Sequence, residues 1–281
     1  MFAYYMKILK FNNGNYKGNV KNSLPHGIGE FEKYKIVKNF SVSGKELTKE
    51  INEVYKGDWK NGKYNGKGKL KITINEEYLS SIDIYSGNWK NNVFEGNGKH
   101  FQYLDGELVT KYTGTLKKLK YHGKGTLTHL GYSRFNDELN KDIGNFKNGK
   151  LDGKSIIIDS LLEYENFSIV EELLSILKKD KKLEKKLGIT STEDLERLNT
   201  YLHNNGWYSL KNFKSENGEK GEIFVEKKGI YKNGKPKGIH VCNIFYQKSK
   251  IKKKLIATYK GILKKKGKHS EWVKKSLSIH D

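Results

Sequence analysis

The sequence of 281 residues has little of several components that define common protein classes. It contains two prolines and a single cysteine, Cys242. So few prolines exclude collagen-like and proline-rich chains, and one cysteine can form neither an internal disulfide nor a cysteine-cluster metal site. No apolar run approaches the roughly 20 residues needed to cross a bilayer. The N-terminal stretch also lacks the pattern of a secretory signal, so we expect a cytoplasmic protein.

Arginine is scarce as well. Only Arg134 and Arg197 occur, although Lys and Arg together number 54 against 32 Asp and Glu, a net charge of +22. Arginine is the residue that reads guanine edges and stacks on bases, so its scarcity argues against sequence-specific recognition of nucleic acid. Non-specific attraction to polyanions is unaffected. Lysine shares AT-rich codons with the abundant Asn, Ile and Tyr, so codon bias accounts for part of the lysine excess.

Glycine and tyrosine, with 29 and 18 residues, are abundant and follow a recurring pattern. The pattern is Tyr-x-Gly-x-Trp followed by Gly-x-Gly, and the copies that begin at Tyr55 and Tyr85 match it most closely. Weaker copies begin near Gly144, Gly229 and Tyr259. The residues that define the first four copies are Tyr16, Gly18, Gly27, Gly29, Tyr55, Gly57, Trp59, Gly66, Gly68, Tyr85, Gly87, Trp89, Gly96, Gly98, Tyr112, Gly114, Gly123 and Gly125.

The spacing within each copy predicts a β-hairpin. Side chains at i, i+2 and i+4 of a strand share one face, so Tyr, Gly and Trp point the same way. The central glycine leaves a notch that an aromatic ring of the neighbouring strand can cover. Asn61-Gly62 and Asn148-Gly149 supply the positive φ angles of a tight turn. Because one hairpin cannot bury its aromatic face, stacked copies predict an elongated, antiparallel, single-sheet solenoid.

These residues resemble the MORN repeat family, whose units read roughly Tyr-x-Gly-x-Trp-x-x-Gly-x-x-x-Gly-x-Gly. The resemblance covers residues 9–158 and 221–263, with copies spaced more widely than is usual, which predicts longer strands or loops at 36–53 and 72–84. It implies a module for attachment, dimerisation or membrane juxtaposition. We therefore expect a non-catalytic scaffold or adaptor with a protein partner, a place at the periphery of an anionic membrane, and self-association.

Between these blocks the apolar period changes from two to 3.6 residues. Ser168 to Glu171 forms a capping-box pattern, and Ile169 to Leu177 follows with an amphipathic face. A second helix is predicted from Thr192 to near Gly206. We expect a helical hairpin inserted beside the sheet that gives partner specificity. The predicted organisation is a repeat array over 1–158, an α-helical insertion over 159–207 and a β block with degenerate repeats over 208–281.

The positive charge is unevenly distributed. Residues 1–158 carry 27 basic and 16 acidic side chains, residues 159–220 carry 10 and 12, and residues 221–281 carry 17 and 4. Lysine clusters attract anionic lipid headgroups, whereas lysines on a sheet edge also prevent aggregation. The predicted anion- or lipid-binding residues of the C-terminal end are Lys252, Lys253, Lys254, Lys264, Lys265 and Lys266.

Motifs for catalysis are absent from the sequence. The glycine-rich segment 57–68 is not a phosphate-binding loop, because no Gly-Lys-Ser/Thr opens a helix there. The eight histidines are scattered without metal-ligand spacing. We therefore expect no enzyme, cofactor or metal. Two alternatives remain: an immunity or antitoxin-type inhibitor of a toxin, similar to bacterial proteins with Asn-Gly-Lys-x-x-Gly hairpins, and an accessory repeat region of an enzyme.

Overall fold

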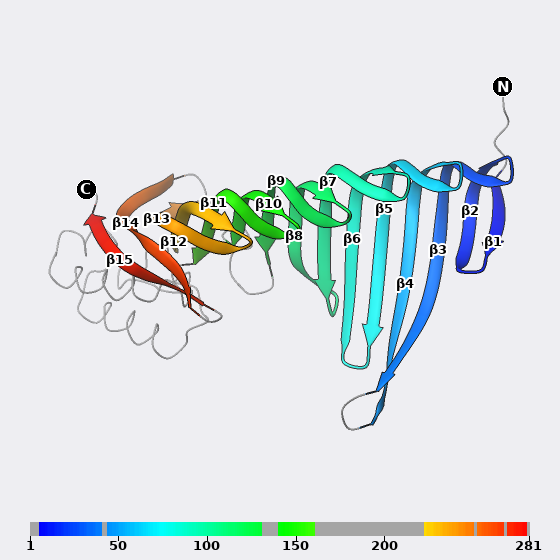
Figure 1. The fold of residues 1–281 in the computed structure, drawn as a ribbon, viewed down its shortest axis with the longest axis horizontal. Helices are drawn as coiled ribbons and strands as arrows, with labels where there is room; N and C mark the ends of the chain where they lie inside the picture. Colours follow the sequence, from blue (N-terminus) through cyan, green and yellow to red (C-terminus); the bar gives the residue numbers. More distant parts are fainter. Residues whose placement is uncertain are drawn as a thin grey trace. The chain divides into compact units, whose positions relative to one another are not determined.

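The structure is a computed structural model that describes residues 6–40, 44–130, 140–160, 222–249, 252–266 and 269–279. Its regular elements within these ranges are all β-strands (Figure 1). In chain order they are β1 (Met6–Phe11), β2 (Gly14–Lys21), β3 (Leu24–Phe40), β4 (Glu46–Lys60), β5 (Lys63–Glu76), β6 (Leu79–Lys90), β7 (Val93–Leu104), β8 (Glu107–Lys117), β9 (Lys120–His129), β10 (Lys141–Lys147), β11 (Lys150–Ser160), β12 (Glu222–Lys232), β13 (Lys235–Ser249), β14 (Lys252–Lys266) and β15 (His269–Ile279).

The strands are hydrogen-bonded in the order in which they occur in the sequence, and the registered pairs are antiparallel. This confirms the prediction of a mainly β, open antiparallel sheet built from consecutive hairpins. The predicted helical hairpin falls within residues 161–221 and so lies outside the described residues. Two compact units are distinguished: unit 1 comprises Met1–Tyr132 with Phe146–Gly149, and unit 2 comprises Ser133–Asn145 with Lys150–Asp281.

Tight two-residue turns close the hairpins, as the Asn-Gly pairs predict. Asn61 and Gly62 have φ values of 50° and 77°, which is the left-handed geometry of a type I′ turn. The fourth copy has no turn glycine, yet Lys118 and Leu119 adopt φ values of 50° and 61°. Such a conformation is costly for a bulky residue. A hydrogen bond from the amide of Lys118 to the Phe94 carbonyl, at 3.0 Å, helps to hold it there.

That hydrogen bond recurs along the chain. At five turns one amide donates to a carbonyl of the preceding hairpin, so these hairpins are joined at their turns as well as through their strands. The pairs are Gly62 to Pro25 at 2.9 Å, Asn92 to Tyr64 at 3.1 Å, Lys118 to Phe94 at 3.0 Å, Gly149 to Tyr121 at 2.9 Å and Gly234 to Leu151 at 2.8 Å.

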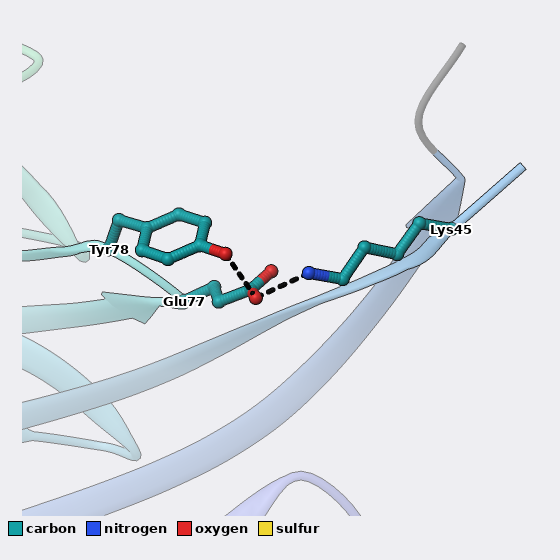
Figure 2. A network of polar contacts seen from close by, with 3 residues as sticks. All are labelled: Lys45, Glu77 and Tyr78. Atoms are coloured by element: carbon teal, nitrogen blue, oxygen red, sulfur yellow. Dashed lines mark hydrogen bonds and ion pairs between the residues drawn. The ribbon is translucent and has the colours of Figure 1, made fainter. Parts of the chain in front are cut away.

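The wide spacing of the early copies is taken up by long strands. The sequence predicted either longer strands or loops here. Residues 36–40 and 46–53 belong to β3 and β4, and residues 72–76 and 79–84 belong to β5 and β6, so these strands extend beyond the repeat motif (Figure 1). The ends of these long hairpins are joined by charged side chains. Figure 2 shows Lys45, which precedes β4, bound to the carboxylate of Glu77 in the turn after β5, with the Tyr78 hydroxyl donating to the same carboxylate oxygen at 2.6 Å.

Strands β11 and β12 connect the two β blocks predicted from the sequence. They pair directly from Gly153 opposite Tyr231 to Ser160 opposite Phe224. Residues 161–221 are therefore inserted between two strands that are neighbours in the sheet of unit 2. The degenerate copies after the insertion continue the hairpin arrangement, because β12 pairs with β13 and β13 with β14.

Candidate interaction surface

The repeat glycines of unit 1 form a single row across the sheet. Gly57 lies opposite Gly29 on one side and opposite Gly68 on the other. Every registered pair from β2 to β9 continues this alignment. We call this line of residues the glycine row: Gly18, Gly29, Gly57, Gly68, Gly87, Gly98, Gly114 and Gly125. Eight of the predicted repeat glycines thus lie side by side in one row.

Aromatic rings cover the glycine row. A Cβ atom placed on Gly68 would lie 2.2 Å from the Tyr55 hydroxyl oxygen, so only glycine leaves space for this ring. Tyr16 covers Gly29 and Tyr112 covers Gly125 in the same way. The hydroxyls of Tyr16, Tyr55 and Tyr112 each donate to the carbonyl three residues further along their own strand, at 2.6, 3.1 and 2.9 Å. Each buried ring therefore has its polar atom satisfied.

Tryptophan links successive hairpins. The ring of Trp59 packs edge-on against Tyr16 and Tyr55, with centroids 5.0 and 5.5 Å apart, a favourable geometry for aromatic pairs. Its Nε1 donates to the Gly29 carbonyl at 3.1 Å. Trp89 repeats this arrangement one hairpin later through the Gly68 carbonyl at 3.3 Å. These rings define the ring face of unit 1, where the packing confirms that Tyr, Gly and Trp share one side of the sheet.

The third copy departs from this arrangement. Phe94, from the second strand of the hairpin, covers both glycines, since a Cβ on Gly87 or Gly98 would lie 2.5 or 2.4 Å from its Cζ. Tyr85 is displaced from the row and stacks on His100, with ring centroids 4.2 Å apart. The neighbouring strand thus supplies the covering ring in this copy. In the other three well-formed copies the first strand of the hairpin supplies it.

His100 is the centre of a polar cluster that sequence reasoning did not single out. It is 5% exposed, and its Nε2 lies 2.7 Å from Asp83 Oδ1 while its Nδ1 lies 2.7 Å from the Tyr121 hydroxyl. Burial raises the pKa of Tyr121 to about 12, so the hydroxyl stays protonated at neutral pH. The cluster joins β6, β7 and β9 in the interior of the ring face. Its groups are committed to one another, which fits a structural role.

The opposite side of the same strands is basic. Lysines occupy the positions between and beside the ring-face residues, so alternation along each strand directs them away from the rings. Lys56, for example, lies between Tyr55 and Gly57, and Lys69 follows Gly68. All of these lysines are exposed. We call this surface the lysine face, formed by Lys17, Lys56, Lys67, Lys69, Lys71, Lys99, Lys111 and Lys124.

The charges of the lysine face are only partly balanced. Lys56 pairs with Glu30 at 3.4 Å, and Asp58 accepts a hydrogen bond from the backbone amide of Lys67 at 2.8 Å. Lys56 also lies directly opposite Lys69 in the β4–β5 register. Like charges at directly opposite positions destabilise a sheet. The period-two placement of lysine next to the repeat glycines was visible in the sequence and could have indicated this face.

The predicted C-terminal lysine clusters lie on one strand. Lys252–Lys254 and Lys264–Lys266 occupy the two ends of β14, which places them roughly 40 Å apart at about 3.3 Å per residue. They therefore form two separate groups. The register sets Lys264 opposite Glu271 on β15, so an acidic residue neighbours the second group.

Unit 2 contains a corresponding row that is built from other residues. Ser155 pairs with Gly229, and His240 pairs with Gly261. A Cβ on Gly229 would lie 2.0 Å from the His240 ring, so the imidazole fills the notch that tyrosine fills in unit 1. His240 is fully buried, and beside it lie the buried side chains of Lys227 and Cys242. Cys242 therefore lies in the core of unit 2.

The described residues contain no group of His, Cys, Asp and Glu side chains that could hold a metal ion. Among the same residues, no helix of sufficient length and apolarity to cross a membrane occurs. The arrangement instead defines a class: an open antiparallel sheet of repeated β-hairpins with a ring face and a basic face.

Comparison with known protein families identifies one repeat that matches parts of the chain. The model of the MORN repeat matches four segments, residues 16–34, 55–73, 85–100 and 143–154. These matches support a MORN-repeat protein, as the resemblance predicted. They include the first, second, third and fifth copies, and the hairpin of the fourth copy has the same glycine pairing and covering tyrosine. No curated protein matches the chain.

Proposed function

We propose that this chain is a non-catalytic scaffold that binds a protein partner through its repeat sheet and does so at an anionic membrane surface inside the cell. MORN repeats generally interact with proteins or membranes. A scaffold function is consistent with this property. The observation that carries the proposal is the separation of the two sides of unit 1. The rings are buried among themselves on one side, and eight lysines are exposed on the other.

The electrostatics of the lysine face support an anionic partner. The opposed Lys56 and Lys69 repel each other in the free protein, so an anionic surface would relieve that repulsion on binding. A basic residue close to an anionic bilayer gains about 1 kcal/mol. Several lysines on one face together are sufficient for reversible attachment, and salt would weaken it.

Vesicle flotation tests the membrane part of the proposal. Wild type should float with vesicles containing phosphatidylserine, should remain behind with neutral phosphatidylcholine vesicles, and should be released by raised salt. The variant K69E/K99E should lose most of this binding. A matched variant, K252E/K254E, tests the predicted C-terminal group. Attachment through lysine would be refuted if flotation did not depend on vesicle charge. It would also be refuted if both pairs of substitutions left flotation unchanged.

A protein partner requires a separate test. Crosslinking and affinity isolation from the native source should recover a partner that also binds the purified protein directly. Because β11 and β12 are neighbours in the sheet, residues 161–221 can be replaced by a two-residue Asn-Gly turn without removing a described strand. Loss of the partner from this variant would support the proposal that the insertion gives specificity. Retention of every partner would contradict it.

A further inference from the structure

Within the described residues, strand β3 has no neighbouring strand on one side along about half of its length. The β2–β3 register ends where Asn15 lies opposite Glu32, whereas β3 continues to Phe40 and stays paired with β4 throughout. Beyond Glu32 no described strand lies on the other side of β3 (Figure 1). We call residues 33–40 the open edge. Its eight residues span roughly 27 Å at about 3.4 Å per residue.

The tight turn after β4 determines which backbone groups face outwards. Lys60 and Lys63 flank the two-residue turn, so they form a hydrogen-bonded pair. Backbone groups alternate sides along a strand, which directs those of Tyr55 and Gly57 from β4 towards β3. The partner residues on β3 are odd-numbered, so the even-numbered residues direct their N–H and C=O groups away from β4. In the open edge these are Tyr34, Ile36, Lys38 and Phe40.

The side chains of the same residues are largely exposed. Tyr34 is 55% exposed, Ile36 51% and Phe40 71%. They project on the side of the sheet that carries the lysine face, since they alternate with residues in register with the ring face. An exposed edge strand of this length with apolar side chains is a template for another strand.

The opposite side of this hairpin is held in place. Lys49 of β4 pairs with Glu76 of β5 at 2.7 Å, and the Lys45–Glu77–Tyr78 contact joins the far end of β4 to the turn after β5 (Figure 2). Strand β3 is therefore supported on its β4 side and presents its other side to solvent within the described structure. A supported edge loses little freedom when a further strand pairs with it.

The charges along the open edge define the chemistry of an incoming strand. Residues 33–40 include Lys33, Lys35 and Lys38 and no acidic residue. Lys33 and Lys38 form ion pairs with Glu53 and Glu46, both at 2.8 Å, but these acids lie on β4. The charged residues of the open edge itself are thus all basic. Acidic residues would complement it, and apolar residues would extend the exposed Tyr34, Ile36 and Phe40.

We propose that the open edge binds an extended segment of a protein partner in which apolar and acidic residues alternate, added to the sheet as a further strand beside β3. This inference rests on the proposed scaffold function and names where, and by which backbone groups, the partner is held. Main-chain hydrogen bonds to the outward groups supply affinity, and the alternating side chains supply specificity. The proposed occupant is a segment of a different protein. The experiment distinguishes this occupant from a second copy of the same chain.

The test uses two variants of the full chain and a displayed peptide library. The library contains eight-residue segments in which apolar residues alternate with Asp, Glu, Lys or Thr. I36P removes one outward N–H and leaves the bonds to β4 intact, because Ile36 donates away from β4. I36T keeps the N–H and reduces only the apolar contact. Wild type should enrich segments with acidic alternate positions, I36P should bind them at least about tenfold more weakly, and I36T only a few-fold more weakly.

Amide hydrogen exchange supplies the signature of strand addition. In free wild type the amides of Tyr34, Ile36 and Lys38 should exchange fast while those of Lys35 and Val37 are protected, and an enriched peptide should slow the fast set alone. Absence of enriched peptides, or equal binding to I36P, overturns the proposal. The proposal is also overturned if the amides of Tyr34, Ile36 and Lys38 are protected in the free protein and lose this protection on dilution. A second copy of the protein would then occupy the open edge. If I36P keeps the native partner, the open edge is refuted while the scaffold function stands.

Discussion

The two units contain corresponding rows of residues that differ in their chemistry. In unit 1 the row consists of glycines covered by neutral rings, and the hydroxyls of Tyr16, Tyr55 and Tyr112 are satisfied by backbone carbonyls. In unit 2, Ser155 and His240 stand in the row, and the position of the covering tyrosine is taken by Lys227. Each hairpin therefore requires that a side chain fill the space beside its row glycine. In three copies of unit 1 this side chain comes from the tyrosine position, and in unit 2 it comes from His240, which lies in the row itself.

The difference also changes how each unit responds to its surroundings. A ring beside glycine gives a dry contact whose polar atom is satisfied. A histidine inside the row fills the same volume but adds a titratable group, and the Nε2 atom of His240 has no hydrogen-bond partner among the described residues. Burial and the nearby Lys227 lower the pKa of His240. Substitutions that exchange the two arrangements test this comparison.

The largest effect is expected from Gly68→Ala. The added Cβ would lie 2.2 Å from the Tyr55 hydroxyl, and the ring is enclosed by Tyr64, Trp59 and Trp89, so it cannot move aside freely. We expect unit 1 to lose about 3 kcal/mol of stability in urea denaturation. The matched change in unit 2, Ser155→Ala, should cost less than about 1 kcal/mol because that position already accommodates a Cβ. Similar losses in both variants would contradict the distinction between the two rows.

The next test converts the sixth copy towards the repeat pattern. Lys227→Tyr alone places a ring where the imidazole of His240 already fills the notch, so it should destabilise unit 2 by about 1–3 kcal/mol through overpacking. Adding His240→Gly frees the notch, and the double variant should recover most of the loss. A double-mutant cycle measures this coupling. Additive losses would show that the two positions do not exchange roles.

The sequence could predict those features of the fold that depend on residues close to one another in the chain. The hairpins, their turns and the shared face of Tyr, Gly and Trp depend on residues within about 15 positions of one another, where strand alternation and turn chemistry determine the geometry. The His100 cluster was not predictable, because Asp83, His100 and Tyr121 belong to three strands whose register depends on bulges. The open edge was missed because it depends on the length of β2 relative to β3, and segment 36–53 was equally consistent with strand or loop.

A third prediction concerns acid pH and unit 2. An unfolded histidine titrates near pH 6.5, whereas the pKa of buried His240 is lowered. The unfolded state therefore binds more protons as the pH falls below 6.5, so the stability contributed by neutral His240 is full above that pH and declines below it. Hydrogen exchange of β12 and β13 amides should accelerate between pH 7 and 5. His240→Gln should flatten this dependence; an unchanged profile would assign it to other groups.

A fourth prediction concerns alkaline pH and unit 1, and it has the smallest effect on stability at neutral pH. Its pH dependence is opposite to that of the third prediction. Burial raises the pKa values of Tyr64, Tyr112 and Tyr121 to about 12, whereas unfolded tyrosines ionise near 10. Between these values the unfolded state has released protons that the folded state retains, so this contribution to stability is full below pH 10 and is lost as the pH rises towards 12. Phenolate absorbance should show a late-titrating group of tyrosines, and Tyr64→Phe should reduce its amplitude by one residue. Complete ionisation near pH 10 with the sheet intact would mean that the rings are open to solvent and do not seal the glycine row.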